Sequence, residues 1–339
     1  MAEKVILLTN LGSPDSTEVK DVRTYLNEFL MDKRVIDIPF FARLLLVKGI
    51  IVPLRAPKSA AKYKTIWTDN GSPLIHITKQ LTEAVEKESG IPTYMCMRYA
   101  NPTPQSVLET IVTEHPDLKE ITMLPLYPHY AMSSYETAVL HVKDTYKAGD
   151  FKFQLKVVEP FYKHPDFIEA LADSIKPFTE KHFDHILFSY HGIPERHVKK
   201  TDPTKNHCLS CTDCCNIPSE THKFCYRHQV IQTTKAVAKT LSIPDGKFSF
   251  SFQSRLGTDS WLKPYSAKLF KEMPNQGIKN LIVVCPAFVS DCLETLEEIC
   301  VEGKEDFEKA GGETFSVVPC LNINTKWVKT AIKLVNEIV

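Results

Sequence analysis

Eight short apolar runs, rich in valine, isoleucine, leucine and phenylalanine, recur along this chain of 339 residues, and each has the length of one β-strand. They cover residues 5–9, 93–99, 121–127, 155–158, 185–190, 248–252, 281–285 and 315–318. Segments with helical periodicity separate most of them, over residues 19–31, 77–88, 103–113, 165–178 and 229–241. Strands that alternate with helices pair in parallel, so this order predicts an α/β fold of the doubly wound type.

The order of short motifs repeats between the two halves of the chain. A strand runs into Gly-Ser-Pro at Gly12 in the first half and into Gly-Ile-Pro at Gly192 in the second. In each half a proline is followed eight residues later by a Glu-Thr pair, which begins at Glu136 and at Glu294. Landmarks that recur in the same order indicate two similar α/β halves.

We therefore predict two Rossmann-like domains with parallel sheets. The N-terminal domain covers residues 1–162, the C-terminal domain covers 163–324, and a final helix covers 325–339. The first domain carries an apolar and basic insertion over 39–70, and the second carries a cysteine-rich insertion over 205–228. Ligands of open α/β sheets bind beyond the carboxyl ends of the strands, so we expect the two sheets to face a central cleft.

Composition excludes several classes of protein. With 43% hydrophobic and 24% charged residues and a formal net charge of zero, the chain is expected to be globular and to bind no nucleic acid. The opening residues lack the pattern of a signal peptide, so we expect a cytoplasmic protein. The longest apolar stretch, Pro39–Leu54, contains Arg43 and Lys48 and is shorter than the roughly 18 residues of a spanning helix. It predicts peripheral contact with a membrane, such as the inner membrane.

The segment SYHGIPERH places His191 at the end of a predicted strand, immediately before a glycine and a proline that end regular structure. An imidazole at a strand end is suited to accepting protons near neutral pH or to holding a metal ion. The alternative is a histidine that only caps a turn.

The segment CPAFVSDCLETLEEICVEG follows a strand and predicts a helix on which Glu294, Glu298 and Glu302 are spaced four residues apart, on one face. The expected apolar face carries Leu293, Leu296 and Cys300. A solvated acidic face is the common outcome of such a row. The functional alternative is a line of oxygen ligands that draws a divalent cation inward.

Eight motifs along nearly the whole chain resemble those of the ferrochelatase family, and they occur in the same order. They are NLGSPDS, LRAPKSAAKY, NGSPL, MRYANPTP, LPLYPHYAMSS, SYHGIPERH, FQSRLGTDSWLKP and CPAFVSDCLETLEE. The resemblance implies a chelatase fold and a lyase that inserts ferrous iron into protoporphyrin IX or coproporphyrin III, the terminal stage of haem biosynthesis.

The resemblance also implies roles for individual residues. His191 and Glu294 are the catalytic pair, and with Glu298 and Glu302 they form the path of the iron. The motifs that line the porphyrin or its propionates contain Leu11, Arg55, Tyr63, Ser72, Arg98, Tyr130 and Trp261. A structural ion pair is the alternative for Arg98. Cys292 stands where certain members of the family have a histidine, so a metal role of that histidine does not transfer to this chain.

Five of the ten cysteines are concentrated in one short segment. They are Cys208, Cys211, Cys214, Cys215 and Cys225. Thiols at two-residue gaps are typical of an iron–sulfur cluster or of tetrahedral zinc, and four of the five suffice for either. Unliganded thiols are the third alternative. The resemblance favours a [2Fe-2S] cluster, because some bacterial ferrochelatases hold one on an internal insertion of this kind.

Two other functions fit part of the pattern. A chelatase of the same fold that acts on a corrin precursor is one, but such relatives are shorter and lack the LRAPKSAAKY and DCLETLEE segments. A non-catalytic porphyrin carrier is the other, and it would need neither a base at His191 nor a row of carboxylates.

Overall fold

The computed structural model describes residues 2–255, 257 and 259–338, which group into two compact units. Unit 1 holds the residues up to 126, residues 132–159 and those from 328 onward, and unit 2 holds residues 127–131 and 160–327. None of the helices in these described ranges is long and apolar enough to cross a membrane. The limits predicted for independently folding domains stay a prediction.

Unit 1 is built on a parallel four-stranded sheet with the order β2-β1-β3-β4. Its strands are β1 (Lys4–Asn10), β2 (Thr93–Met97), β3 (Glu120–Pro125) and β4 (Gln154–Val157). The central strand β1 pairs with β2 and β3, and its residues 5–10 are all buried. A strand covered on both faces reads as a continuous apolar run, which is why the sequence indicated it so clearly.

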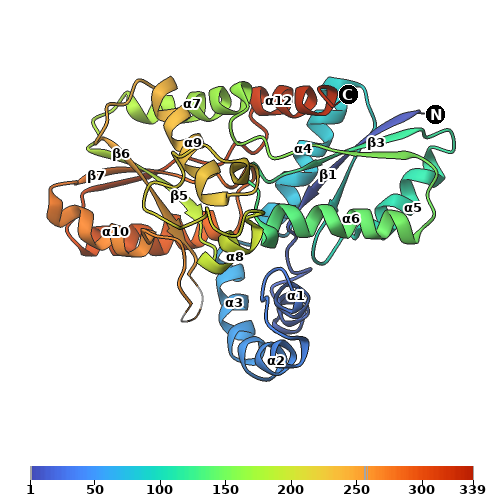
Figure 1. Ribbon diagram of the computed structural model, residues 1–339, viewed down its shortest axis with the longest axis horizontal. Coiled ribbons are helices and arrows are strands. Elements are labelled where there is room, and N and C mark those ends of the chain that lie inside the picture. The colour runs from blue at the N-terminus through green and yellow to red at the C-terminus, as the bar shows by residue number, and fades with distance from the viewer. Residues whose placement is uncertain (1, 256, 258, 339) are drawn as a thin grey trace. The chain divides into compact units, whose positions relative to one another are not determined.

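The helices of unit 1 are α1 (Val19–Met31), α2 (Phe40–Leu44), α3 (Val52–Ile66), α4 (Pro73–Ser89), α5 (Pro104–Glu114) and α6 (Thr137–Ala148), with π-helical segments η1 (Leu45–Ile51) and η2 (Met132–Glu136). Proline occupies the first turn of α4 and α5, where no backbone donor is lost. Thr103 caps α5 by accepting the Ser106 N–H at 3.2 Å. Helices α1 and α3 pack together with η1, and they lie below the sheet in Figure 1.

Unit 2 repeats the sheet, with the order β6-β5-β7-β8 and parallel pairing throughout. Its strands are β5 (His185–His191), β6 (Phe248–Gln253), β7 (Asn280–Val284) and β8 (Thr314–Val317). Its helices are α7 (Pro165–Thr179), α8 (Glu195–Thr201), η3 (Glu220–Lys223), α9 (Tyr226–Thr240), α10 (Ser266–Glu272), η4 (Met273–Gln276), η5 (Glu294–Gly303) and α11 (Lys304–Lys309). The chain ends with α12 (Thr325–Asn336).

Helices α7 and α9 lie on one side of the second sheet, and α10 lies on the other (Figure 1). The core on the α10 side is formed by Leu187, Phe270, Met273, Leu281, Val283, Cys285, Ile299, Phe307 and Phe315. This core anchors η5 through Ile299, so the position of η5 relative to the strand ends is set by packing. The eight predicted strands and the parallel α/β architecture are confirmed.

Candidate active site

His191 is the last residue of β5, the central strand of unit 2, and its side chain is half-buried. Its Nδ1 lies 2.7 Å from the Gly192 carbonyl oxygen. A carbonyl only accepts hydrogen bonds, so Nδ1 carries the proton and Nε2 carries the lone pair of the neutral ring. The ring meets Phe288 edge to face at 6.4 Å. This environment fixes the tautomer that a proton-accepting Nε2 requires.

The loop after His191 needs glycine because the neighbouring chain comes very close. A Cβ at Gly192 would stand 2.8 Å from the Gln253 carbonyl oxygen and 3.1 Å from the Trp261 ring. The Gly192 N–H donates to the same Gln253 carbonyl at 2.9 Å. Trp261 is buried and pairs with Pro194 in a short bridge, so this predicted porphyrin residue adjoins the His191 loop.

Gln253 connects the His191 loop to the helix of Glu294. It ends β6, and besides its carbonyl contact to Gly192 its side-chain Nε2 donates to the Glu294 carbonyl oxygen at 3.2 Å. Its Oε1 accepts a hydrogen bond from Ser189 at 2.7 Å. Gln253 lies in the FQSRLGTDSWLKP motif but is not among the predicted site residues. Its place at a strand end, next to the strand of His191, is the signal that would have found it.

The helix that bears Glu294 differs from the prediction. Residues Glu294–Gly303 form a π-helix, whose i→i+5 hydrogen bonds give about 4.4 residues per turn. Residues four apart then stay close to one line, and the buried line is Thr295, Ile299 and Gly303. The expected apolar face of Leu293, Leu296 and Cys300 is wrong, because it assumed the period of an α-helix, and these three side chains are only half-buried.

The predicted carboxylate row runs beside this buried line and becomes more exposed along the helix. Glu294 and Glu298 are half-buried, whereas Glu302 is exposed. The hydroxyl of Ser254, the residue after β6, donates to the Glu298 carboxylate. Burial, and then the charge of Glu294 and a hydrogen bond to it, raise the pKa of the Cys292 thiol well above its ordinary value. Cys292 is therefore a neutral thiol that donates to Glu294.

Four other predicted porphyrin residues of unit 1 lie on or beside three different elements. Leu11 follows β1 and is half-buried, Arg55 and Tyr63 lie on α3, and Ser72 is the buried residue before α4. Tyr63 is packed edge to face against Trp67 at 6.2 Å.

Arg98 is engaged in a buried polar network of unit 1. Its Nη2 lies 2.5 Å from an Asp32 carboxylate oxygen, and its Nε donates to the Thr137 hydroxyl at 2.8 Å. Its guanidinium also stacks over the Tyr99 ring at 4.2 Å. Although burial raises the pKa of Asp32, hydrogen bonds from Thr137 and the Arg34 backbone and the Arg98 charge lower it overall. These contacts favour the structural alternative for Arg98.

Tyr130 belongs to unit 2 and is held by α9. Its backbone N–H donates to Gln229 Oε1 at 2.7 Å, and its ring meets Phe224 edge to face at 5.4 Å. Phe224 lies inside the cysteine-rich insertion, directly before Cys225, and Gln229 lies on α9, shortly after it. The insertion therefore supports at least one predicted porphyrin residue.

Four of the five clustered cysteines are buried together in unit 2. Hydrogen bonds link their thiols in the order Cys208, Cys225, Cys215 and Cys214, whereas Cys211 is exposed. The bond to Cys208, followed by burial, raises the pKa of Cys225 to about 12. The Arg227 guanidinium lies 3.2 Å from the Cys215 sulfur. The pKa values of the Cys214 and Cys215 thiols are raised as well, although the Arg227 charge beside them acts in the opposite direction.

Histidines and a buried aspartate hold the cysteine segment in shape. His207 donates to the Cys214 carbonyl at 2.9 Å and His228 to the Cys215 carbonyl at 2.7 Å. The Asp202 carboxylate accepts the N–H groups of His207 and Cys208 at 2.9 and 2.8 Å. Burial raises the pKa of Asp202, but these and other hydrogen bonds outweigh it and lower the pKa below its ordinary value. The loop is therefore preorganised by its own side chains.

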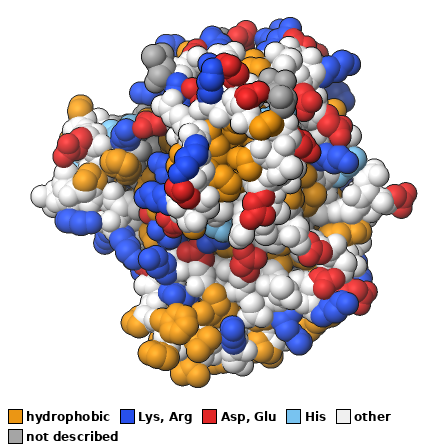
Figure 2. Space-filling model, turned by 90° about the vertical axis from the view of Figure 1, so that its right-hand side faces the viewer, with side chains coloured by type: hydrophobic (Ala, Val, Ile, Leu, Met, Phe, Trp, Pro, Cys, Tyr) orange, Lys and Arg blue, Asp and Glu red, His pale blue; other side chains and the backbone are white. Residues whose placement is uncertain are grey.

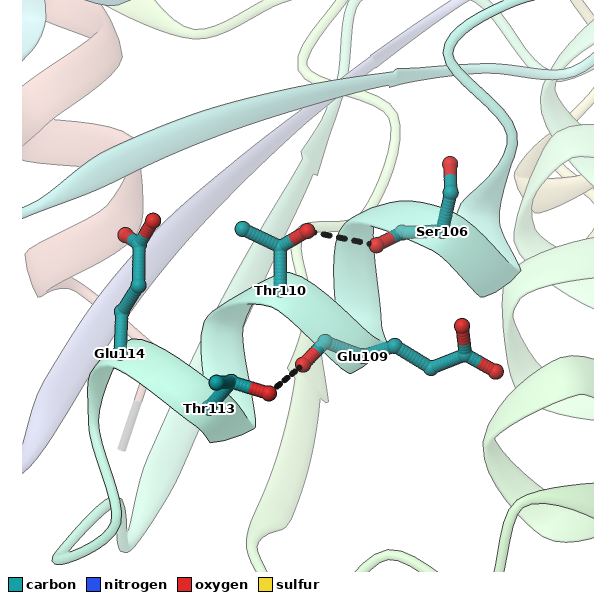
Figure 3. Close-up of a pocket in the computed structure, with 5 residues that line it drawn as sticks. All are labelled: Ser106, Glu109, Thr110, Thr113 and Glu114. Carbon is teal, nitrogen blue, oxygen red and sulfur yellow. Dashed lines mark hydrogen bonds between the residues drawn. The ribbon is translucent and has the colours of Figure 1, made fainter.

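No group of three or more His, Cys, Asp or Glu side chains in the described ranges is arranged to hold a metal ion. A surface hollow of about 410 Å³ lies on α5 and is lined by Ser106, Glu109, Thr110, Thr113 and Glu114. The hydroxyls of Thr110 and Thr113 donate to carbonyls one turn earlier on the same helix (Figure 3). The hollow contains none of the predicted site residues.

Comparisons with known proteins agree with the motifs. The family model described as Ferrochelatase matches residues 3–338. The chain is 46% identical to a ferrochelatase of Pseudomonas syringae pv. tomato, over 98% of both chains, and 48% identical to one of Opitutus terrae, over 95% of this chain and 94% of that one. The solved structure of SirB from Bacillus subtilis with Fe3+ is similar in fold, with a TM-score of 0.55, 12% identity and coverage of 99% of this chain and 95% of SirB.

Proposed function

The chain belongs to the ferrochelatase family, and from this premise we propose that His191 and Glu294 carry out the insertion of ferrous iron into a porphyrin. It is a lyase of the terminal step of haem biosynthesis. The proposed substrates are ferrous iron and either protoporphyrin IX or coproporphyrin III. The propionate contacts that distinguish the two porphyrins involve Arg55 and Ser72 in this proposal.

Metallation requires that the pyrrole protons be removed and that the porphyrin ring bend. The first requirement needs a base. A free-base porphyrin carries two pyrrole N–H protons where the metal must enter, so a base must accept them. The Nε2 of His191 has one lone pair for this step, because Nδ1 is committed to the Gly192 carbonyl, so it accepts the two protons one after the other and releases each to solvent. Glu294 is the carboxylate at the start of η5, and the Cys292 thiol supports it as a hydrogen-bond donor.

The porphyrin ring must also bend, since its nitrogen lone pairs otherwise point into the ring plane. A surface complementary to the bent ring uses binding energy to favour the distorted state. We assign contacts with the porphyrin ring to Leu11 and Tyr63 of unit 1 and, separately, to Tyr130 and Trp261 of unit 2. Arg98 contributes to the proposed surface only by stabilising unit 1, because Asp32 and Thr137 already engage its guanidinium.

The observation that carries the proposal is the pair of contacts made by Gln253, which binds the residue after His191 and the backbone of Glu294. Both contacts come from one residue at the end of β6, and this supports a shared site for the His191 loop and the start of η5. The test is anaerobic incubation of the purified protein with excess porphyrin and ferrous iron. Loss of porphyrin fluorescence over many turnovers per chain is expected. Binding without turnover would indicate a carrier, and a preference for cobalt and a corrin precursor would indicate the other chelatase.

Glu298 and Glu302 are proposed to guide iron toward Glu294, since carboxylate oxygens suit a hard divalent cation. Glu298→Gln is expected to raise the KM for ferrous iron at least about threefold with a smaller effect on kcat. Glu302→Gln should have the weaker effect, because Glu302 is exposed whereas Glu298 is half-buried. Iron titrations at saturating porphyrin measure both, with exposed Glu305→Gln as the control. An unchanged KM for ferrous iron in both variants would show that the carboxylate row is only a solvated face of the helix.

The four buried thiols fit the resident [2Fe-2S] cluster that we propose. Such a cluster takes two thiolates per iron, so it needs four cysteines in pairs and no group of three ligands around one ion. Cys208, Cys214, Cys215 and Cys225 supply these ligands in the proposal, and exposed Cys211 does not. The raised pKa values of Cys214, Cys215 and Cys225 mean that metal binding must displace protons from these thiols. When bound, the cluster supplies crosslinks between the two ends of the insertion.

We propose that the protein acts at a membrane surface, because porphyrin and haem are poorly soluble in water. Large apolar side chains on α2, η1 and α3 are exposed, and they are Phe40, Phe41, Leu45, Ile50 and Leu54. We call these five residues the apolar lip. They gather at the lower end of the face in Figure 2, where α2 lies in Figure 1. Exposed apolar patches of this kind are typical of protein or membrane contacts.

Phe41→Asp with Leu45→Asp is expected to abolish most binding to vesicles that contain anionic lipid. These side chains are 77% and 73% exposed, so the change removes lipid contacts at little cost to folding. Cosedimentation with liposomes measures it. Ile323→Asp, which alters an exposed apolar side chain outside the lip, is the control. If the parent protein does not sediment with vesicles, the lip serves the porphyrin alone.

A further inference from the structure

The first turn of α9 joins the cysteine segment directly to the His191 loop. Cys225 stands immediately before α9 and is one of the four buried thiols. The next residue, Tyr226, donates its hydroxyl to the His191 carbonyl oxygen at 2.8 Å. One peptide bond therefore separates a proposed cluster ligand from the side chain that holds the backbone of the proposed base.

We propose that Tyr226 is a positioning residue for His191, and that the cluster acts on iron insertion by holding Tyr226 in place. This inference rests on the proposed function. A cluster that only stabilised the fold would leave the turnover of each folded chain unchanged. The proposal predicts instead that loss of the cluster lowers this turnover.

The structure gives Tyr226 little freedom once Cys225 is fixed. The Cys225 sulfur caps α9 by accepting the His228 N–H at 3.5 Å. The Tyr226 ring is buried, with Phe252 at 6.3 Å and His129 at 6.0 Å between ring centroids. A displacement of Cys225 therefore moves the start of α9 and with it the Tyr226 hydroxyl.

The orientation of the His191 ring depends on the same peptide. Its Nδ1 bonds to the Gly192 carbonyl, so the ring follows the backbone at residues 191 and 192. Tyr226 holds the His191 carbonyl and Gln253 holds the Gly192 N–H, which are the two ends of one peptide unit. Loss of the tyrosine contact leaves this peptide held at one end only, and the direction of Nε2 becomes less defined.

Gln229, one turn further along α9, makes a parallel connection. Its Nε2 donates to the Lys223 carbonyl at 2.8 Å, within the insertion, and its Oε1 accepts the Tyr130 N–H at 2.7 Å. The same helix start therefore links the insertion to two predicted site residues. A helix that makes both connections is suited to transmit the state of the insertion.

Tyr226→Phe tests the proposal, because it removes the hydroxyl and keeps the ring. We expect kcat to fall about tenfold with an unchanged KM for porphyrin and unchanged iron and sulfide content. Tyr135→Phe is the matched control, since Tyr135 donates to the Val158 carbonyl at the same 2.8 Å in unit 1. The control should lose similar thermal stability and keep its turnover.

The coupling itself is tested by removing the cluster with a chelator from wild type and from Tyr226→Phe. Per folded chain, cluster removal should lower kcat in wild type and have no further effect in the variant, because both changes release the same contact. Losses that multiply, or a variant that behaves like the Tyr135→Phe control, would overturn the proposal.

Hydrogen exchange provides a readout that needs no iron insertion. Peptides that cover residues 186–196 should exchange faster after cluster removal in wild type, and in Tyr226→Phe before it. Unchanged exchange in both wild type and Tyr226→Phe would refute the link between the cluster and the His191 loop. This holds even if Tyr226→Phe folds poorly, because the comparison of wild type before and after cluster removal does not use the variant. Wild-type protein that shows the exchange effect but inserts no iron would reject the proposed function and keep the coupling.

Discussion

Replacement of His191 by alanine is expected to lower kcat for iron insertion by a factor of about 10² to 10⁴, the usual range for loss of a general base. The dissociation constant for porphyrin should change little, because the imidazole is assigned to the pyrrole protons and not to the face of the macrocycle. The structure supports this separation. His191 ends β5, its tautomer is set by the Gly192 carbonyl, and the apolar contacts are assigned to other residues.

The measurement is steady-state metallation under anaerobic conditions, with porphyrin binding followed by fluorescence quenching. His182→Ala is the control, since His182 lies outside the site and its side chain is 78% exposed. Near-normal turnover in His191→Ala would show that His191 is not the base and only caps a turn. Loss of porphyrin affinity together with turnover would point to a collapsed loop.

Cys225→Ser and Cys208→Ser are each expected to eliminate the visible absorption of the proposed cluster and to lower Tm by several degrees. The folded state alone presents four thiols together, so cluster binding stabilises it by mass action. Total activity should fall mainly through unfolding, with an additional loss per folded chain through Tyr226. Cys211→Ser is the matched control, because its side chain is exposed and the other four are buried.

Protein purified without air should be reddish brown and contain about two irons and two sulfides per chain. Metal and sulfide analysis with thermal melts of the three variants measures the prediction. A colourless protein with one zinc per chain would replace the cluster by a zinc site. A colourless protein without metal would leave unliganded thiols, and a colourless Cys211→Ser variant would move that residue into the ligand set.

The fold could be predicted because its signals are local. Strands such as β1 and β5 are buried on both faces, so their composition alone indicates them, and regular alternation with helices fixes the parallel pairing. The repeat of short motifs, at Gly12 and Gly192 and at two Glu-Thr pairs, indicated two similar halves. The structure shows a four-stranded sheet of matching order in each unit.

The site was predicted less completely, because several contacts depend on segments far apart in sequence. Gln253 and Tyr226 bind the His191 loop across gaps of tens of residues, and nothing in their local sequence indicates these bonds. The π-helix at Glu294 was missed for another reason. A spacing of four residues aligns side chains in both an α-helix and a π-helix, so the acidic row fitted either, and the i→i+5 backbone hydrogen bonds of the folded chain distinguish them.

The most direct test of the central claim, that His191 and Glu294 act together on one metallation step, is a double-mutant cycle read by single turnover. Porphyrin is bound first to wild type, His191→Ala, Glu294→Gln and the double variant, and ferrous iron is then mixed in while absorbance follows metallation. We predict that each single variant is slow and that the double variant is hardly slower than His191→Ala, as expected for groups that serve the same step. Losses that multiply, or a wild-type rate in either single variant, would contradict the account.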